Sequence, residues 1–569
     1  MSKQESTFVV FPTYSDIFKE GEEYVIEQLS KEGLAERYII YSTSISGLLY
    51  TDHIKGYSAQ AYIMKEFENV LCNTDDGRKI LSYLHVHKQS PLNINAFTMM
   101  SLYQLLLNHR KGKCLNLTIT EEDKLLYLKL ILIANESRFS KLGDYGTSLK
   151  DISVNDVFLY EKLFWPILLA ESDINETVSV EFDIFRLKSI IEYIEKTYPE
   201  TTIIINDFFQ SRGFDGYMTY ASSFALFYLD YISTYTNDKT LKTGIADNDR
   251  NRLLLMPLTI NDIANVDNFL QLKSHPLYYY NNAYYVINWS YFLSQIYIGT
   301  FKELESRIRS IVIKGLKDLK KEAGSIIERT LLKKVLENSF GRIWQKVSFD
   351  ESNGQLPDAL FKIGNHLFFI ELKDSLMDEI TMESFNFNSI ETHIRENFVE
   401  KIVQDKGKNK IKKKGASQLA SYIAQYKSGC YQHFPYNSKL NIYPIIVHTD
   451  YKYRLNGLNH YLSMAFDDII AKDETLSLMK RRIFPLTVMG LDVFFNLQVK
   501  FREKKLKLAD VIDDYHRHSK NSVKKYANRG VERYSQLYPS FERYFPECRK
   551  ILLSSAEFQA IFKSDFFQI

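Results

Sequence analysis

Cysteine is scarce in this sequence, and the few cysteines are scattered. The 569 residues include only Cys72, Cys114, Cys430 and Cys548, and no two of them form a CxxC pair. A zinc site built from cysteine pairs is therefore not expected. Isolated cysteines are typical of free thiols in a reducing compartment, so we expect a cytoplasmic protein.

Long apolar runs and an excess of one charge are also missing. No uninterrupted apolar stretch reaches the ~18 residues that a membrane-spanning helix needs, and residues 1–16 lack the pattern of a signal peptide. We therefore expect no association with a membrane. The 72 Lys and Arg residues nearly balance the 70 Asp and Glu residues, for a formal net charge of +2. Nucleic-acid binding would have to come from local basic patches.

The length exceeds what one hydrophobic core usually supports, so two to four domains are expected. Residues 1–240 show mainly helical spacing of apolar residues and carry no recognisable catalytic motif, which favours a recognition or regulatory region. The polar segment 236–252 predicts a linker. After it we expect a hairpin and helical connector over 253–320, a mixed α and β domain over 321–500, and a helical C-terminal extension over 501–569.

Two β-hairpins are predicted after this linker. Aromatic runs on both sides of Asn281-Asn282 favour a hairpin with a two-residue turn, followed by a helix from Trp289. The second hairpin, LPDALFKIGNHLFFIELKDS, occupies residues 356–375 and turns at Gly364-Asn365. A two-residue loop pairs Ile363 with His366, and the same register places Asp358 directly opposite Glu371, with Cβ atoms ~5 Å apart.

Three charged residues interrupt the second hairpin where a buried strand should be apolar: Asp358, Glu371 and Lys373. Alternation along a strand places Glu371 and Lys373 on the same face. Directly opposed carboxylates repel each other, and a divalent cation between them removes the conflict. Oxygen ligands suit Mg²⁺, with Mn²⁺ as an alternative, and such an ion activates water for attack on a phosphate.

Pro357-Asp358, followed after twelve residues by Glu371-Leu372-Lys373, resembles the core motif of the PD-(D/E)XK nuclease superfamily. The resemblance covers about residues 320–455. It implies a mixed α+β and α/β fold, in which a largely helical N-terminal region precedes a restriction-endonuclease-like αβββαβ core with a helical C-terminal extension. It also implies that Asp358, Glu371 and the Leu372 carbonyl bind the metal, and that Lys373 assists the attack of water.

Two weaker elements of the same family pattern flank the hairpin. An upstream helix in the family often presents a Glu that completes the metal shell, and Glu328 is the residue expected there as catalytic and metal-binding, with Glu337 as the alternative. A downstream helix offers Gln418 and Tyr422, which resemble the QxxxY element of RecB-like members. Gln418 would orient Lys373 or a phosphate. Residues 441–450 are expected to form the next core strand.

A lysine-rich run lies just before the Gln418 helix. Residues 401–415 contain seven lysines and one aspartate. Its position beside the predicted metal site favours contacts with phosphates, and the residues predicted to bind nucleic acid are Lys408, Lys410, Lys412, Lys413 and Lys414. A solvated flexible loop is the alternative.

The sequence thus predicts a Mg²⁺-dependent endonuclease or exonuclease that hydrolyses phosphodiester bonds, with no cofactor besides the metal. The resemblance favours DNA as the substrate, because most members cut DNA. Cleavage of RNA, including transfer RNA, only with a protein partner is an alternative, and a non-catalytic module that binds nucleic acid or protein is another. A homo-oligomer also stays open. Fusion to a long helical region resembles bacterial anti-phage defence effectors, an analogy of fold alone.

Overall fold

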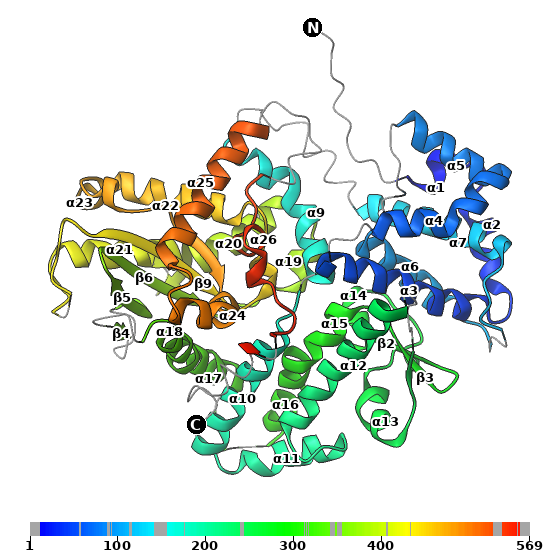
Figure 1. The fold of residues 1–569 in the computed structure, drawn as a ribbon, viewed down its shortest axis with the longest axis horizontal. Helices are drawn as coiled ribbons and strands as arrows, with labels where there is room; N and C mark the ends of the chain where they lie inside the picture. Colours follow the sequence, from blue (N-terminus) through cyan, green and yellow to red (C-terminus); the bar gives the residue numbers. More distant parts are fainter. Residues whose placement is uncertain are drawn as a thin grey trace, which may run out of the picture. The chain divides into compact units, whose positions relative to one another are not determined.

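The computed structural model (Figure 1) places most of the chain. The described residues are 12–55, 59–87, 92, 94–112, 116–141, 156–175, 177–238, 244–311, 313, 316, 318–341, 347–349, 356–405, 408–432, 434–526, 537–554 and 556–557. Among these residues, no helix combines the length and the apolar character that crossing a membrane requires.

The chain divides into two compact units. The first contains the described residues of Met1–Ser148, Asp173–Asn175 and Thr202–Arg307, and the second contains those of Leu149–Ser172, Glu176–Thr201 and Ile308–Ile569. This division differs from the expected boundaries at residues 240, 320 and 500. Part of the predicted N-terminal region belongs with the C-terminal sheet, and the predicted connector is divided at Arg307, with 253–307 in the first unit.

The first unit is mostly helical and has a small sheet. Its helices are α1 (Tyr14–Ile17), α2 (Glu22–Glu27), η1 (Gln28–Ser30), α3 (Leu34–Lys55), α4 (Ala59–Asn73), α5 (Asp75–Val86), α6 (Ala96–Asn108), α7 (Glu121–Lys141), α11 (Thr201–Ser211), α12 (Tyr217–Asp238), α13 (Asp249–Leu255), η3 (Met256–Leu258), α14 (Phe269–Ser274), α15 (Trp289–Ser294), η4 (Gln295–Gly299) and α16 (Thr300–Arg309). The helical prediction for this part of the chain is therefore confirmed in the described residues.

The first predicted hairpin is confirmed, and it gains a third strand. β2 (Leu277–Tyr280) and β3 (Ala283–Val286) pair with Tyr280 opposite Ala283, and Asn281 and Asn282 turn the chain at φ values of 46° and 56°. Asparagine tolerates these left-handed values better than most residues. β1 (Gly244–Ala246) pairs with β3 from within the segment predicted as a linker, so that prediction is wrong for this strand.

The buried Asp247 side chain explains why the polar segment is ordered there. Its carboxylate accepts hydrogen bonds from the hydroxyls of Tyr279 and Tyr284, at 2.9 and 3.1 Å, and forms an ion pair with Arg252. A charged sequence that reads as a linker thus anchors the edge of a sheet.

The second unit is built around a mixed five-stranded sheet. The strand order is β10 (Thr487–Gly490), β9 (Asn441–His448), β6 (His366–Lys373), β5 (Ala359–Ile363) and β4 (Val347–Phe349). β4, β5 and β6 form an antiparallel meander, while β9 runs parallel to β6 and to β10. The prediction of a strand over 441–450 is confirmed as β9.

Helices surround this sheet in the second unit. They are α9 (Leu159–Asn175), α10 (Val180–Thr197), α17 (Leu319–Ile326), η5 (Ile327–Leu331), α18 (Leu332–Phe340), α19 (Glu379–Glu383), α20 (Phe387–Phe398), α21 (Gly415–Lys427), η6 (Tyr451–Tyr453), α22 (Leu458–Lys472), α23 (Glu474–Ser477), η7 (Lys480–Arg482), α24 (Leu491–Arg502), α25 (Leu508–Tyr526), α26 (Phe541–Tyr544) and η9 (Pro546–Cys548). A separate antiparallel ribbon consists of β7 (Glu400–Asp405) and β8 (Lys408–Lys413).

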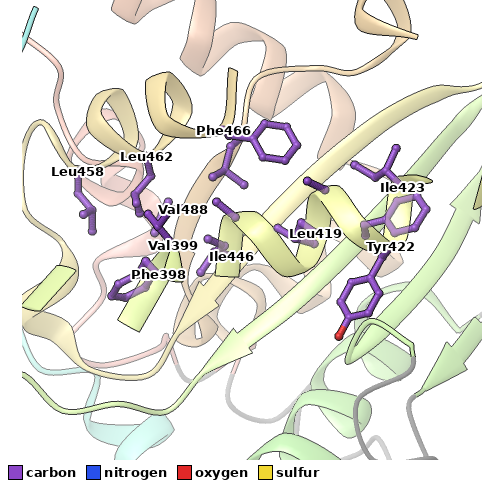
Figure 2. Close-up of a cluster of buried hydrophobic side chains, with 14 of the residues drawn as sticks. Phe398, Val399, Leu419, Tyr422, Ile423, Ile446, Leu458, Leu462, Phe466 and Val488 are labelled. Atoms are coloured by element: carbon purple, nitrogen blue, oxygen red, sulfur yellow. The ribbon is translucent and has the colours of Figure 1, made fainter. Parts of the chain in front are cut away.

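Alternate residues of the sheet strands pack against different helices. On one face, Leu360, Phe369 and Ile446 join a buried apolar cluster with α20, α21 and α22, part of which Figure 2 shows. On the other face, Phe361 stacks on Phe340 of α18 at 5.3 Å between ring centroids, and Phe340 in turn contacts α24. The sheet is therefore covered on both sides, which explains the near-continuous apolar sequence of β6 and β9.

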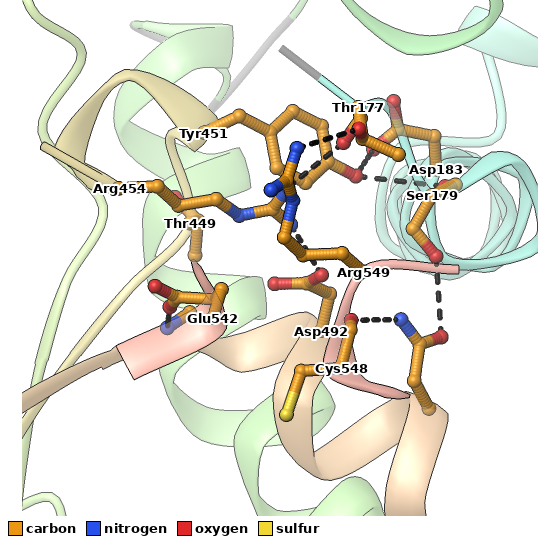
Figure 3. Close-up of polar contacts among 12 residues, drawn as sticks. Thr177, Ser179, Asp183, Thr449, Tyr451, Arg454, Asp492, Glu542, Cys548 and Arg549 are labelled. Carbon is orange, nitrogen blue, oxygen red and sulfur yellow. Dashed lines mark hydrogen bonds and ion pairs between the residues drawn. The ribbon is translucent and has the colours of Figure 1, made fainter. Parts of the chain in front are cut away.

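A buried polar network fixes α10 to the loop after β9, which explains why α10 belongs to the second unit (Figure 3). The Tyr451 hydroxyl donates to Asp183 Oδ1 at 2.8 Å. Arg454, only 1% exposed, donates to the Thr177 carbonyl at 2.8 Å and pairs with Asp492. Apolar periodicity reveals a helix at α10, but it does not reveal these distant partners.

Candidate active site

The β5–β6 hairpin has the register that the sequence predicts. Ile363 lies opposite His366 and Ala359 opposite Ile370, and Gly364 turns the chain with a φ of +58°. A glycine at the first position of a two-residue turn suits this left-handed conformation. Asp358 directly precedes β5, so the same register carries it to the level of Glu371.

Asp358 is tied to the opposite strand through its side chain. Its Oδ2 accepts a hydrogen bond from the Leu372 backbone N–H at 2.6 Å, and only 9% of the residue is exposed. β5 begins one residue later, so the carboxylate takes the place that a backbone carbonyl would occupy in a longer ladder. This bond fixes the carboxylate beside the backbone of the ExK motif.

Glu371, Lys373 and Gln418 form a connected polar group. Lys373 Nζ donates to Glu371 Oε1 at 2.6 Å and to Gln418 Oε1 at 2.8 Å. The lysine and glutamate come from one face of β6, and the glutamine comes from the first turn of α21. The ammonium is thus held by a strand and a helix that are distant in sequence.

This group is largely removed from water. The Glu371 side chain is 4% exposed and the Lys373 side chain 12%. A buried ion pair of this kind gives little net stability, because desolvation offsets most of the attraction. The pair therefore adds little to the net stability of the hairpin.

Asp374 marks a second polar cluster directly after the motif, and no sequence pattern selects it. Its Oδ1 accepts a hydrogen bond from Arg186 Nη2 at 2.9 Å and another from the Thr449 hydroxyl. Arg186 also donates to the Thr449 hydroxyl at 3.2 Å and is 3% exposed. The cluster ties the end of β6 to the end of β9 and to α10. This cluster can be recognised only in the structure, where β6 pairs with β9, because its residues are far apart in the sequence.

His448 is a further residue near the site that sequence reasoning missed. It ends β9 opposite Lys373 in the ladder, and 1% of it is exposed. Its Nε2 lies 3.7 Å from Glu542 Oε1, which also accepts the Gly490 backbone N–H at 2.7 Å. The predicted C-terminal extension therefore contributes a carboxylate beside the end of β9.

The two candidate helix acids differ in what the structure describes. Glu328 lies in the π-helical turn η5, and its side chain is outside the described part. The neighbouring helix α17 approaches the end of β6, because a Cβ added at Gly324 would lie 3.4 Å from Asp374 Oδ2. Glu337, the alternative, lies exposed on α18.

The remaining predicted residues fall into two groups. Tyr422 is 4% exposed and belongs to the apolar cluster of α21 (Figure 2). Lys408, Lys410, Lys412 and Lys413 lie on the exposed strand β8, and Lys414 follows it. The alternative, a solvated flexible loop, is wrong only in that the described residues form paired strands, since β7 and β8 pair over six residues each and β8 is fully exposed.

Lys414 connects these lysines electrostatically to the candidate site. Burial lowers the pKa of its ammonium, and repulsion from Lys373 and Lys412 lowers that pKa further. Lys414 thus lies close to Lys373 and to the ribbon lysine Lys412, while Glu371 acts in the opposite direction on its pKa.

The donor set at the hairpin fits a hard divalent cation. Asp358 and Glu371 provide buried carboxylates, and Leu372, whose backbone N–H bonds Asp358, also carries a backbone carbonyl. Within the described residues no group of three or more His, Cys, Asp or Glu side chains could hold a metal ion. Two carboxylates and a carbonyl match the sparse protein shell of Mg²⁺, which keeps several water ligands.

The comparisons with known proteins add no family to this geometry. Neither the protein-family models, nor the curated proteins, nor the solved structures that were searched contain a match to the chain.

Proposed function

We propose that the second unit is a Mg²⁺-dependent nuclease that hydrolyses phosphodiester bonds of DNA. The observation that carries the proposal is the convergence of Asp358, Glu371 and Lys373 at one end of a covered sheet, with Lys373 held by Gln418. Two buried carboxylates beside a buried ammonium have no evident packing role there. They suit a site that handles a metal ion and a phosphate.

Each residue has a distinct role in this proposal. Asp358, Glu371 and the Leu372 carbonyl hold the cation, which when bound lowers the pKa of a water ligand and stabilises charge on the phosphate. Lys373 donates hydrogen bonds to the attacking water or to a phosphate oxygen. Gln418 positions the Lys373 ammonium and does not itself need to contact the substrate. Glu328 is proposed as an additional ligand, direct or through water.

The order of elements in the second unit supports a restriction-endonuclease-like core. Helices α17 and α18 precede the meander β4–β5–β6, and α21 and the parallel strand β9 follow it. With α19, α20 and the β7–β8 ribbon as insertions between β6 and α21, this order is compatible with the αβββαβ order that the resemblance implies. β10 and α24 then extend the core beyond that pattern.

DNA is proposed over RNA on the strength of the superfamily resemblance. A role in anti-phage defence, a protein partner and a homo-oligomer stay predictions from the sequence. The helical first unit carries no described feature that identifies what it recognises.

The first experiment incubates the purified chain with Mg²⁺ or Mn²⁺ and linear, circular or single-stranded DNA, or total RNA. Lys373→Ala and Asp358→Asn are assayed beside the parent, and Lys480→Ala, an exposed lysine of the same unit, is the matched control. We expect DNA cleavage that is lost in the first two variants and retained in the control. Mg²⁺ binding by the parent and by Asp358→Asn is measured separately by calorimetry.

The outcomes separate the alternatives. Cleavage of RNA only would replace the proposed substrate. Absence of cleavage together with absence of Mg²⁺ binding would favour the non-catalytic module. Mg²⁺ binding that depends on Asp358, without cleavage of any substrate, would indicate that a partner is required.

A further inference from the structure

The β7–β8 ribbon projects as an exposed arm. All six residues of β8 are exposed, and the two strands pair from Glu400 opposite Lys413 to Asp405 opposite Lys408. Six residues of antiparallel strand span roughly 17 Å. A two-stranded ribbon has no hydrophobic core of its own.

The pairing sorts the side chains of the ribbon into two unlike faces. Directly paired residues share a face, so Lys401, Val403, Lys410 and Lys412 lie on one face, which the Asp405–Lys408 pair continues. The opposite face carries the exposed pair Ile402 and Ile411 together with Glu400, Gln404, Asn409 and Lys413. The two faces therefore differ strongly in charge, and we call the first the lysine face.

The contacts at the base of the ribbon show how the two faces are directed. Lys413 Nζ donates to Ser421 Oγ of α21 at 2.6 Å, and Glu400, Ile411 and Lys413 line a groove of about 860 Å³ with α21 and α22. The Ile face is therefore turned toward those helices. The lysine face points away from them.

The lysine face is continuous with the candidate active site. The Lys414 backbone N–H donates to the Val399 carbonyl at 2.9 Å and closes the ribbon at the start of α21, one turn before Gln418. Lys401, Lys412 and Lys373 all lie near enough to Lys414 to lower the pKa of its ammonium. Lys401 also pairs with Glu396 at 2.8 Å, an exposed contact that a phosphate can displace.

The amino-acid composition of the ribbon indicates which form of nucleic acid the ribbon is suited to bind. Residues 400–413 contain no Phe, Tyr or Trp, so the arm offers no platform for the stacking that binds single strands. The major groove of B-form DNA is about 12 Å wide and admits a two-stranded ribbon. The major groove of A-form RNA is too narrow for side chains to read.

We propose that the β7–β8 ribbon is an arm for double-stranded DNA, whose lysine face enters the major groove next to the phosphate at the candidate active site. The inference rests on the proposed nuclease function and deepens it by assigning a duplex substrate. Lys401, Lys408, Lys410 and Lys412 contact the phosphates and base edges that border the groove. The Ile face remains against the groove formed with α21 and α22.

Binding to labelled nucleic acid in EDTA tests this arm without cleavage. The probes are a DNA duplex of about 20 base pairs, the RNA duplex of the same sequence, and the single DNA strand. The variant replaces all four residues of the lysine face by Gln. The matched control replaces four exposed lysines elsewhere in the second unit by Gln: Lys439, Lys480, Lys504 and Lys507.

We expect the parent to prefer the DNA duplex, and the variant to lose about tenfold or more in affinity for it at low salt. The slope of log affinity against log salt should fall by up to about 3.6, since each of the four phosphate contacts contributes ~0.9. The control should change little. Equal binding of all three probes, or an unchanged affinity of the lysine-face variant, would overturn the inference.

Cleavage with Mg²⁺ separates this inference from the proposed function. If the parent cuts nothing but binds duplex DNA through the lysine face, the nuclease proposal fails and the arm stands. If Lys373-dependent cleavage is found and the lysine-face variant cuts duplex DNA with an unchanged KM, the arm fails and the nuclease stands.

Discussion

Lys373 Nζ lies 2.6 Å from Glu371 Oε1, two residues earlier on the same face of β6. Neighbours at this spacing in a strand project side by side. Because both side chains are almost fully buried, each charge depends on the other for compensation. The ion pair therefore couples the stability of the hairpin to the chemistry that we propose for it.

Substitutions of this pair should separate its contribution to stability from its contribution to cleavage. Lys373→Met leaves the Glu371 carboxylate buried beside an apolar chain, and we expect it to lower the free energy of unfolding by about 3 kcal/mol. Glu371→Gln combined with Lys373→Met should recover most of that loss, to within about 1 kcal/mol of the parent. Both variants should lack cleavage. Urea unfolding and the DNA assay measure the two quantities, and a stable Lys373→Met variant would refute the coupling.

Substitution of Asp358 by asparagine should abolish Mg²⁺ binding with little change in the free energy of unfolding. Asp358→Asn keeps an oxygen that accepts the Leu372 N–H, whereas Asp358→Ala leaves that buried donor without its acceptor. We expect the alanine variant to be about 1–3 kcal/mol less stable than the parent, and the asparagine variant to stay within about 1 kcal/mol of it. Calorimetry should find Mg²⁺ binding lost in both. Mg²⁺ binding retained by the asparagine variant would remove Asp358 from the metal site.

Two glycines at positive φ should respond differently to alanine. Gly364 has φ +58° with open space around an added Cβ, so Gly364→Ala should cost only about 1–2 kcal/mol of backbone strain. At Gly415 an added Cβ would lie 2.3 Å from the Phe398 carbonyl oxygen. Gly415→Ala should therefore displace the start of α21, which carries Gln418, and lower both stability and cleavage. Equal urea midpoints for the two variants would contradict the close approach of a Cβ at Gly415 to the Phe398 carbonyl oxygen.

The buried Asp183 should make stability depend on pH. Burial raises the pKa of its carboxyl from 3.8 to about 7, although Arg186 nearby opposes this rise. The folded state then keeps a proton that the unfolded state releases between roughly pH 4 and pH 7, so stability falls as pH rises through that window and levels off above it.

Asp183→Asn tests this dependence, because the amide still accepts the Tyr451 hydroxyl but does not ionise. The difference in unfolding free energy between parent and variant should change by about 1.4 kcal/mol per pH unit inside the window. Urea unfolding at several pH values measures it. A difference that is constant with pH would show that Asp183 is ionised in the folded chain throughout.

The β5–β6 hairpin was predictable because its determinants are local. Gly364 favours the turn, and an apolar run lies on each side of it. Together they define the register, and that register brings Asp358 to the level of Glu371. The link from Lys373 to Gln418 was expected from a family resemblance only. Forty-five residues separate the two in the chain, and no local pattern specifies that contact.

Local sequence patterns did not predict two features: that α10 belongs to the second unit, and that the lysine run forms a ribbon. α10 looks like any amphipathic helix, yet buried Asp183 and Arg186 bind it to the loop after β9. The lysine run looks like a loop because exposed lysines disfavour strands, yet cross-strand pairing orders it. The partners of α10 lie outside its own segment, whereas the two strands of the ribbon pair with each other inside the lysine run.

The ribbon is inserted in the connection between two strands whose positions are already fixed. β6 and β9 pair along eight residues, and the crossover between them carries the arm on its way to α21. Changes in the length or sequence of the arm therefore leave the ladder and the buried charges intact. Under the proposed function, substitutions in the arm would alter substrate preference without altering the candidate active site, and an arm from another protein could replace it between the same two residues.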